Sequence, residues 1–142
     1  MSFDPKDILR IMEEHVPFNK VLGIRGESAG AGRAVLILPV RPDFVGDTRR
    51  PALHGGVLSA LIDTAGGVAA WSALAEGESV STVDLRVDYL EPASLRAPLR
   101  AEAEMVRKGN RVCHVRIMLM QDGVLVAEGR GVYNIHRHAK RE

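Results

Sequence analysis

The sequence predicts an α+β protein in which a largely antiparallel sheet wraps around one long helix. A stretch rich in alanine and glycine, residues 57–74, carries apolar side chains at helical spacing. Residues 80–90 instead alternate apolar and polar side chains, and two hairpin turn signals separate the strand-like segments that follow, up to residue 135. The chain has 142 residues, 46% apolar and 26% charged, which matches a single domain with a hydrophobic core.

The segment before the long helix predicts one short helix and one strand. Asp4 followed by a proline is typical of a helix N-terminus, and we expect Pro17 to end this first helix. Arg33–Val40 mixes branched apolar residues and predicts an early strand. A glycine-rich stretch over residues 23–32 precedes it. Arg41–Leu53 holds two prolines and several polar residues, so we expect a loop there.

The long helix follows His54 and two glycines and is predicted over Val57–Leu74. Two further glycines, Gly66 and Gly67, lie inside it, and each costs about 1 kcal/mol relative to alanine. Such a cost is tolerable where side-chain bulk is forbidden, so we expect another backbone to press against the helix here. The packed face is predicted by residues at three- and four-residue spacing, which are Leu58, Leu61, Ile62, Ala65 and Ala69.

Four strands joined by turns are predicted after Gly77. The first, Val80–Leu90, alternates with period two and predicts a half-buried strand whose apolar positions are Val83, Leu85, Val87 and Tyr89. The other predicted strands are Leu99–Arg107, Arg111–Met120 and Val124–Ile135, with turn signals at Lys108–Asn110 and Gln121–Gly123.

We expect one domain over residues 1–142, with a helical segment at 1–20 and a flexible tail at 136–142. Lys and Arg number 19 against 18 Asp and Glu, so no basic field predicts nucleic acid as a partner. The single cysteine, Cys113, cannot form an internal disulfide, and no Cys/His spacing predicts a metal site. The N-terminus lacks an apolar signal core, and Asp63 interrupts the longest apolar stretch, so we expect a cytoplasmic protein without a membrane span.

The strongest candidate for a reactive site is the group His54, Gly55 and Asp63. Glycines at a helix start expose backbone N–H groups at the positive end of the helix dipole, which suits a developing oxyanion. The alternative is that the glycines merely allow a tight turn into the helix. Asp63 carries the one charge within residues 57–74, and a carboxylate inside a helix is expensive unless it is paired or functional. The alternative is a solvent-facing side chain or one bonded to Thr64 or Ser59.

Spacing sets a condition on any joint action of Gly55 and Asp63. Eight residues of helix separate them, which is about 12 Å along the helix axis. Both groups would have to lie within roughly 3 Å of one reacting carbonyl. One helix cannot achieve this, so a shared reaction predicts a homodimer whose two sites each combine residues of both copies.

Weaker candidates lie on the strands that follow. Ser81 and Thr82 begin a strand and offer hydroxyl groups near Asp63, or simply face water at a strand edge. Arg107, Lys108 and Arg111 surround a turn and form a basic cluster suited to a phosphate, or a solvated hairpin tip.

With these residues in hand, the chain resembles the hotdog-fold acyl-CoA thioesterases of the PaaI type. The resemblance covers about residues 21–135. It lies in PALHGGVLSALIDTAGG at Pro51–Gly67, VDLRVDYLEPA at Val83–Ala93 and RKGNR at Arg107–Arg111. An acid nine positions after the histidine of HGG is a specific part of it.

The resemblance implies a hotdog fold, with an antiparallel sheet of five or six strands around the long helix. It implies a homodimer joined at its sheet edges, often doubled to a tetramer, and hydrolysis of medium-chain or aromatic acyl-CoA with no metal or other cofactor. By position, Gly55 would donate to the thioester oxygen beside His54. The partner subunit's Asp63 would act as base or nucleophile with help from Thr82. The cluster of Arg107, Lys108 and Arg111 would lie near the CoA phosphates.

One departure from the family pattern concerns the loop before HGG. Many members carry Asn or Gln there to hold the water or the thioester, whereas this chain offers Asp47 and Thr48. Thr48 retains a hydroxyl for hydrogen bonding, while Asp47 would bring a second negative charge toward Asp63 if the two were close.

Two other functions compete with thioester hydrolysis. A hotdog enoyl-thioester hydratase needs a histidine and an acid at the β-carbon, and His54 is the one histidine in the loop–helix region. A non-catalytic acyl-CoA-binding module usually accompanies a DNA-binding segment, for which the sequence has no spare length.

Overall fold

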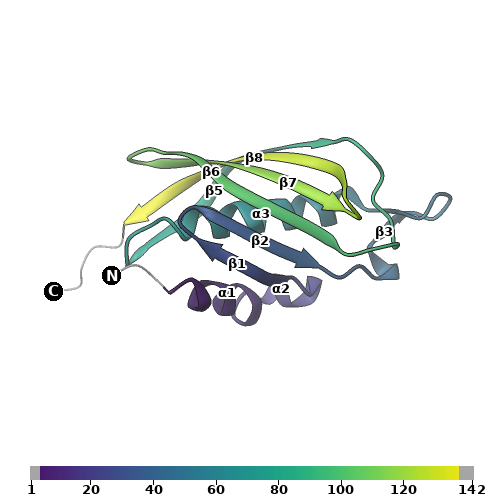
Figure 1. The fold of residues 1–142 in the computed structure, drawn as a ribbon, viewed down its shortest axis with the longest axis horizontal. Coiled ribbons are helices and arrows are strands. Elements are labelled where there is room, and N and C mark those ends of the chain that lie inside the picture. The colour runs from purple at the N-terminus through teal and green to yellow at the C-terminus, as the bar shows by residue number, and fades with distance from the viewer. Residues whose placement is uncertain (1–3, 138–142) are drawn as a thin grey trace.

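The structure, a computed structural model, describes residues 4–137 and consists of one six-stranded antiparallel sheet curved around a central helix (Figure 1). The strand order is β1-β2-β6-β7-β8-β5. The hotdog architecture predicted above is therefore confirmed. The sheet strands are β1 (Arg25–Gly30), β2 (Arg33–Leu38), β5 (Glu78–Tyr89), β6 (Leu99–Lys108), β7 (Val112–Gln121) and β8 (Val124–Arg137).

The N-terminal segment forms two helices, α1 (Pro5–Glu14) and α2 (Pro17–Leu22), which lie beside β1 in Figure 1. The Asp4 carboxylate caps α1 by accepting the Lys6 N–H at 2.9 Å. Pro17 begins α2 instead of only ending the first helix, because a proline fits the first helical position, where its missing N–H has no helical partner.

The expectation of a loop over residues 41–53 is only partly right. A short 3-10 turn at Pro42–Phe44 leads into a two-stranded sheet of β3 (Val45–Asp47) and β4 (Ala52–Leu53). Phe44 is buried and its carbonyl accepts the His54 N–H at 2.8 Å. This small sheet therefore fixes the point at which the central helix begins.

The central helix, α3 (Gly55–Trp71), buries every residue of its predicted packed face. It begins two residues earlier than predicted because His54 caps it, and it ends three residues earlier than predicted, at Trp71, with Ser72 as its C-cap. Its two internal glycines differ. A methyl group on Gly66 would collide with the Tyr133 ring, whereas one on Gly67 would meet only the edge of that ring at 3.7 Å. The expected close approach therefore exists at Gly66, but the Tyr133 side chain makes it and not another backbone. No such approach exists at Gly67.

Strand β5 follows the predicted range, but two of its apolar side chains face solvent: Val83 is 62% exposed and Tyr89 54% exposed. The register shifts between Thr82 and Asp84, so Val83 is the extra residue of a bulge, and the simple alternation breaks there. β8 continues to Arg137, so the first two residues of the expected tail belong to the sheet. Residues 138–142 lie outside the described residues.

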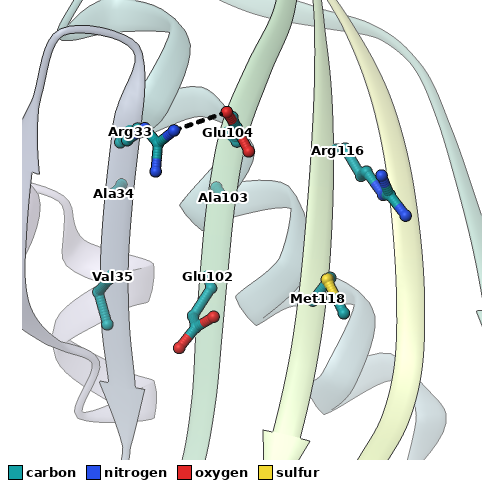
Figure 2. A pocket seen from close by; sticks show the side chains of 8 residues that line it. All are labelled: Arg33, Ala34, Val35, Glu102, Ala103, Glu104, Arg116 and Met118. Atoms are coloured by element: carbon teal, nitrogen blue, oxygen red, sulfur yellow. Dashed lines mark hydrogen bonds and ion pairs between the residues drawn. The ribbon is translucent and has the colours of Figure 1, made fainter.

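The face of the sheet that points away from α3 is charged (Figure 2). Arg33 and Glu104 form an ion pair of 2.8 Å there, beside a hollow of about 250 Å³ that Glu102, Arg116 and Met118 also line. The apolar core therefore lies on the inner face, and Cys113 is buried within it. None of the helices within residues 4–137 combines the length and the hydropathy that crossing a membrane requires.

Candidate active site

The first turn of α3 is capped by the side chain of His54. The His54 Nδ1 atom accepts the N–H of Gly56 at 2.8 Å. Because Nδ1 accepts, the neutral imidazole carries its proton on Nε2, which remains a donor. A methyl group on Gly56 would lie only 2.8 Å from Nδ1, so the glycine is needed for this cap.

Gly55 lies under the ring of Tyr89, a residue that the sequence analysis did not assign to the site. The Tyr89 hydroxyl donates to the Gly55 carbonyl at 3.0 Å and also hydrogen-bonds Ser59. A methyl group on Gly55 would lie 3.3 Å from that ring. Steric fit therefore accounts for Gly56 and, less strictly, for Gly55, whereas neither glycine has a positive φ angle that a tight turn would require. The case for an oxyanion site rests instead on the Gly55 N–H, which no hydrogen bond among residues 4–137 uses.

Asp63 lies in the middle of α3, half-buried, with its carboxylate held through one oxygen. Thr82 on β5 donates its hydroxyl to Asp63 Oδ1 at 2.8 Å, and Tyr133 on β8 donates to the same oxygen at 3.4 Å. No hydrogen bond within residues 4–137 ends on Oδ2. The alternative partners are engaged elsewhere, since Thr64 donates to the Ala60 carbonyl and Ser59 bonds Tyr89.

Tyr133 is the second site residue that sequence reasoning missed. It is 1% exposed and also donates to the Asp63 carbonyl at 3.1 Å. Burial, with the nearby Asp63 charge, raises the pKa of Tyr133 well above its ordinary value, so the hydroxyl keeps its proton. Methyl groups on Gly66 or Gly131 would collide with its ring. Gly66 lies on α3 and Gly131 on β8. Glycines at these two positions were the one sequence signal that a large buried side chain lies between the helix and the strand.

Asp47 and Thr48 lie on the β3–β4 hairpin, at the start of α3. Asp47 accepts the Arg49 N–H at 3.0 Å and the guanidinium groups of Arg49 and Arg50. The hydrogen bond from Arg49 is the main reason why the pKa of Asp47 is lowered. Within the described residues neither Asp47 nor Thr48 contacts Asp63, so the charge of Asp47 is paired inside its own hairpin.

The basic cluster of Arg107, Lys108 and Arg111 surrounds the turn between β6 and β7. Lys108 Nζ donates to the carbonyl of Ala73 at 3.2 Å, just beyond the C-terminal end of α3. The structure therefore places this cluster at the opposite end of α3 from His54 and Gly55. Within this single chain it brings together Asp63 with Thr82, and separately His54 with Gly55.

Comparison with known proteins shows the family and the fold. Residues 51–128 match the family model of the thioesterase superfamily. The chain is 33% identical over 135 residues to the medium/long-chain acyl-CoA thioesterase YigI of Salmonella typhimurium, covering 85% of this chain and 86% of that one. A thioesterase family protein from Silicibacter pomeroyi has a TM-score of 0.84 at 25% identity, covering 94% of this chain and 98% of that one. A mutant of the phenylacetic acid degradation protein PaaI from Thermus thermophilus has a TM-score of 0.76 at 29% identity, covering 87% and 100%.

The curved antiparallel sheet around one helix is the hotdog fold, and together with these matches it identifies a thioester hydrolase of that fold. The chain belongs to the thioesterase superfamily.

Proposed function

We propose that the protein hydrolyses medium-chain or aromatic acyl-CoA thioesters at sites shared between two copies of the chain. The observation that carries the proposal is the Asp63 carboxylate. Thr82 and Tyr133 hold its Oδ1 atom, which leaves Oδ2 available to a water molecule or a thioester carbon. Acyl-CoA is also the substrate class in the name of the relative from Salmonella typhimurium.

The distance along α3 supports a site built from two copies. Gly55 and Asp63 belong to one helix and lie about 12 Å apart along its axis. Strand β5, which carries Thr82, pairs with β8 on one side and with no described strand on the other. If two copies join through β5 about a two-fold axis, their α3 helices run antiparallel and the Gly55 of one copy approaches the Asp63 of the other.

The proposed reaction uses water and the groups of the chain itself. Asp63 Oδ2 takes a proton from water as the water oxygen bonds to the thioester carbon. The carbonyl π electrons move to oxygen, and the Gly55 N–H, with the His54 Nε2–H beside it, stabilises that oxyanion. The oxyanion then re-forms the carbonyl as the C–S bond breaks, and the CoA thiolate takes the proton back from Asp63. Direct attack by Oδ2 would instead give an anhydride that water hydrolyses.

The remaining assignments complete the proposal. Thr82 and Tyr133 act as positioning residues for Asp63. Arg107, Lys108 and Arg111 bind CoA phosphates at the far end of α3, where exposed cations can reach an extended ligand. Thr48 is the candidate for holding water or the thioester from the partner copy.

A matched pair of variants tests the backbone donor. Gly55→Pro removes the N–H at the first helical position, where proline is tolerated, and His54 already has the extended conformation that a following proline requires. Gly55→Ala adds a similar contact with Tyr89 but keeps the N–H. We expect thiol release from acyl-CoA to fall at least about a hundredfold in Gly55→Pro. Equal activity of the two variants would exclude this donor.

A mixing experiment tests whether the site is shared. Gly55→Pro and Asp63→Asn are each expected to be inactive alone. After the two are unfolded and refolded together, half of the dimers combine one variant of each kind and contain one intact site. Activity should then return to about a quarter of the wild-type value. No recovery in mixed dimers confirmed by mass spectrometry would place both groups in one protomer.

The competing functions give different results in the same assays. A hydratase would consume enoyl-CoA without releasing thiol, and Asp63→Asn would abolish that absorbance change. A binding module would bind acyl-CoA without turnover, with Asp63→Asn binding as the wild type does.

A further inference from the structure

An apolar groove of about 320 Å³ runs along the C-terminal half of α3. Its floor includes Gly67 and Val68 on α3, and β5 forms one wall through Val80. The opposite side is closed by Ile11 of α1 and Val16, which precedes α2. Figure 1 shows α1 and α2 lying beside β1, along the edge of the sheet. The groove is therefore a channel between the central helix, one strand and the N-terminal helices.

The groove continues directly from the Asp63–Thr82 hydrogen bond. Gly67 lies one helical turn beyond Asp63, on the same face of α3. Val80 lies two residues before Thr82, and the bulge comes only after Thr82, so both side chains lie on the same face of β5. The two elements run antiparallel, so Gly67 and Val80 form the next step after Asp63 and Thr82. An acyl group whose carbonyl carbon lies at Asp63 has this channel ahead of it.

Gly67 has no role in the fold that would require a glycine. A methyl group there would meet only the edge of the Tyr133 ring at 3.7 Å, which is an ordinary contact. Gly67 has no positive φ angle, so any residue could adopt its backbone conformation. Helix propensity favours alanine at such a position. A larger side chain at residue 67 would occupy the groove.

The length of the channel favours an aliphatic chain. From Asp63 past Gly67 to Trp71, which also lines the groove, is two helical turns and about 12 Å along the axis. Thr64, between them, donates its hydroxyl to the Ala60 carbonyl, so its methyl group is the part left to line the groove. A mainly apolar groove that extends from Thr64 to Trp71 along α3 offers more length than a single aromatic ring needs, which favours an extended alkyl chain.

Resting on the proposed thioesterase function, we infer that Gly67 is a specificity-determining residue that admits a medium-length alkyl chain into this groove, beneath α1 and α2. A side chain at residue 67 blocks the channel one turn past the carboxylate. Acyl groups long enough to pass that turn then lose the contacts that bind them. Short acyl groups never reach it.

The test compares wild type with Gly67→Ala and Gly67→Leu, using acetyl-CoA, butyryl-CoA, octanoyl-CoA and phenylacetyl-CoA. The measured quantity is the ratio of kcat/KM for octanoyl-CoA to that for butyryl-CoA. We expect Gly67→Leu to lower this ratio by about tenfold or more, with Gly67→Ala between it and wild type. The reverse change, Ile11→Ala, widens the groove and should raise the ratio of dodecanoyl-CoA to octanoyl-CoA.

Lys20→Leu is the matched control, since it adds a leucine of the same size at an exposed position of α2 that does not line this groove. Its chain-length ratio should equal that of the wild type. Circular dichroism and thermal unfolding establish that each variant is folded. A ratio unchanged in both Gly67 variants, or phenylacetyl-CoA preferred over octanoyl-CoA by the wild type, would overturn the inference.

Binding separates this inference from the proposed function. The thioethers S-octyl-CoA and S-ethyl-CoA cannot be hydrolysed, so calorimetry with them reports on the groove even if no substrate is turned over. We expect wild type to bind S-octyl-CoA about tenfold more tightly than S-ethyl-CoA, and Gly67→Leu to lose that preference. Absence of hydrolysis with the preference intact would refute the enzyme function alone. Equal binding of the two thioethers by wild type would refute the groove alone.

Discussion

The two edge strands of the sheet, β1 and β5, are built in different ways. β1 has six residues, and its edge is obstructed: the Glu13 side chain of α1 accepts the Gly26 N–H, and Glu27 at the β1 bulge pairs with Arg100 at 2.8 Å. β5 has twelve residues, no described strand on its outer side, and an apolar side chain, Val83, that is 62% exposed. One edge is covered and charged, and the other is long and open.

This difference shows which edge is suited to meet another chain. An open edge presents unpaired backbone groups and is a hazard unless something covers it, and charges and covering helices are the usual protection. β1 has both kinds of protection. β5 also carries Thr82, which holds Asp63, so the open edge and the candidate carboxylate occupy the same side of the protein. A second copy pairing at β5 would therefore complete the site at the point where it assembles.

The largest expected effect comes from breaking the β5 edge. Val83→Asp adds a negative charge next to Asp84 on the edge strand of each copy, where the proposed interface would bury it. We expect the protein to become monomeric and thiol release to fall at least about a hundredfold, because each proposed site combines residues of both copies. Light scattering and the thiol assay, run at the same protein concentrations, check this.

The corresponding change at the other edge is Ser28→Asp on β1, at an exposed position. This substitution should change neither the number of chains in the assembly nor the rate of thiol release. A monomeric Val83→Asp variant with full activity would show that one chain holds a whole site.

A smaller effect is expected from the hydrogen bond that ties β5 to α3. Thr82→Val removes the donor to Asp63 while keeping the side-chain shape. Losing a hydrogen bond to a charged group costs about 1.5–3 kcal/mol, so kcat should fall about ten- to hundredfold with KM little changed. Ser81→Ala is the adjacent control, because Ser81 bonds His136 and not Asp63. Equal kcat values for the two variants would remove Thr82 from the positioning role.

The covered edge predicts an effect on stability instead of on chemistry. Leu9 of α1 packs over Gly26 of β1, where a methyl group would collide with its side chain. Because Leu9 is only half-buried, Leu9→Ala should lower the free energy of unfolding by about 1–2 kcal/mol, less than at a fully buried site. Urea unfolding measures this, and the mass of the assembly should stay the same. A change of assembly would mean that β1 also meets a partner.

The smallest expected effect is a pH dependence from Tyr133, on the strand next to β5. Its pKa is raised in the folded protein, whereas an unfolded tyrosine ionises near pH 10. Its contribution to stability is therefore complete below about pH 10 and declines as the pH rises from there toward the folded pKa. We expect wild type to be more stable than Tyr133→Phe at about pH 8. The difference between their free energies of unfolding should become smaller as the pH is raised to about 11. A constant difference between them would contradict the assignment.

Most of the fold could be predicted because its signals are local and periodic. Leu58, Leu61 and Ile62 share one helical face, and all are buried as expected. The register of β5 could not be predicted, since the bulge at Val83 depends on its pairing with β8. The β3–β4 sheet was missed because two short strands leave no repeat to detect.

The candidate site was predictable in its residue types and less so in its connections. His54, Gly55 and Asp63 follow from a motif along one segment. Tyr89 and Tyr133 come from distant strands, and no spacing rule places a phenol against a helix 34 or 70 residues away. Gly66 and Gly67 show the same limit. They are neighbours of one type, and only the structure shows that Tyr133 occupies the space beside Gly66 while Gly67 lines a groove.

The contact among Gly66, Gly131 and Tyr133 restricts which substitutions this sequence can accept during evolution. Any side chain at residue 66 or 131 collides with the tyrosine ring, so neither glycine can be replaced while the ring is present. A smaller residue at 133 would release both positions, but it would take away a hydrogen bond to Asp63 in the same step. Natural variants should therefore keep all three residues or change them together, with some other donor to the carboxylate taking the place of the phenol.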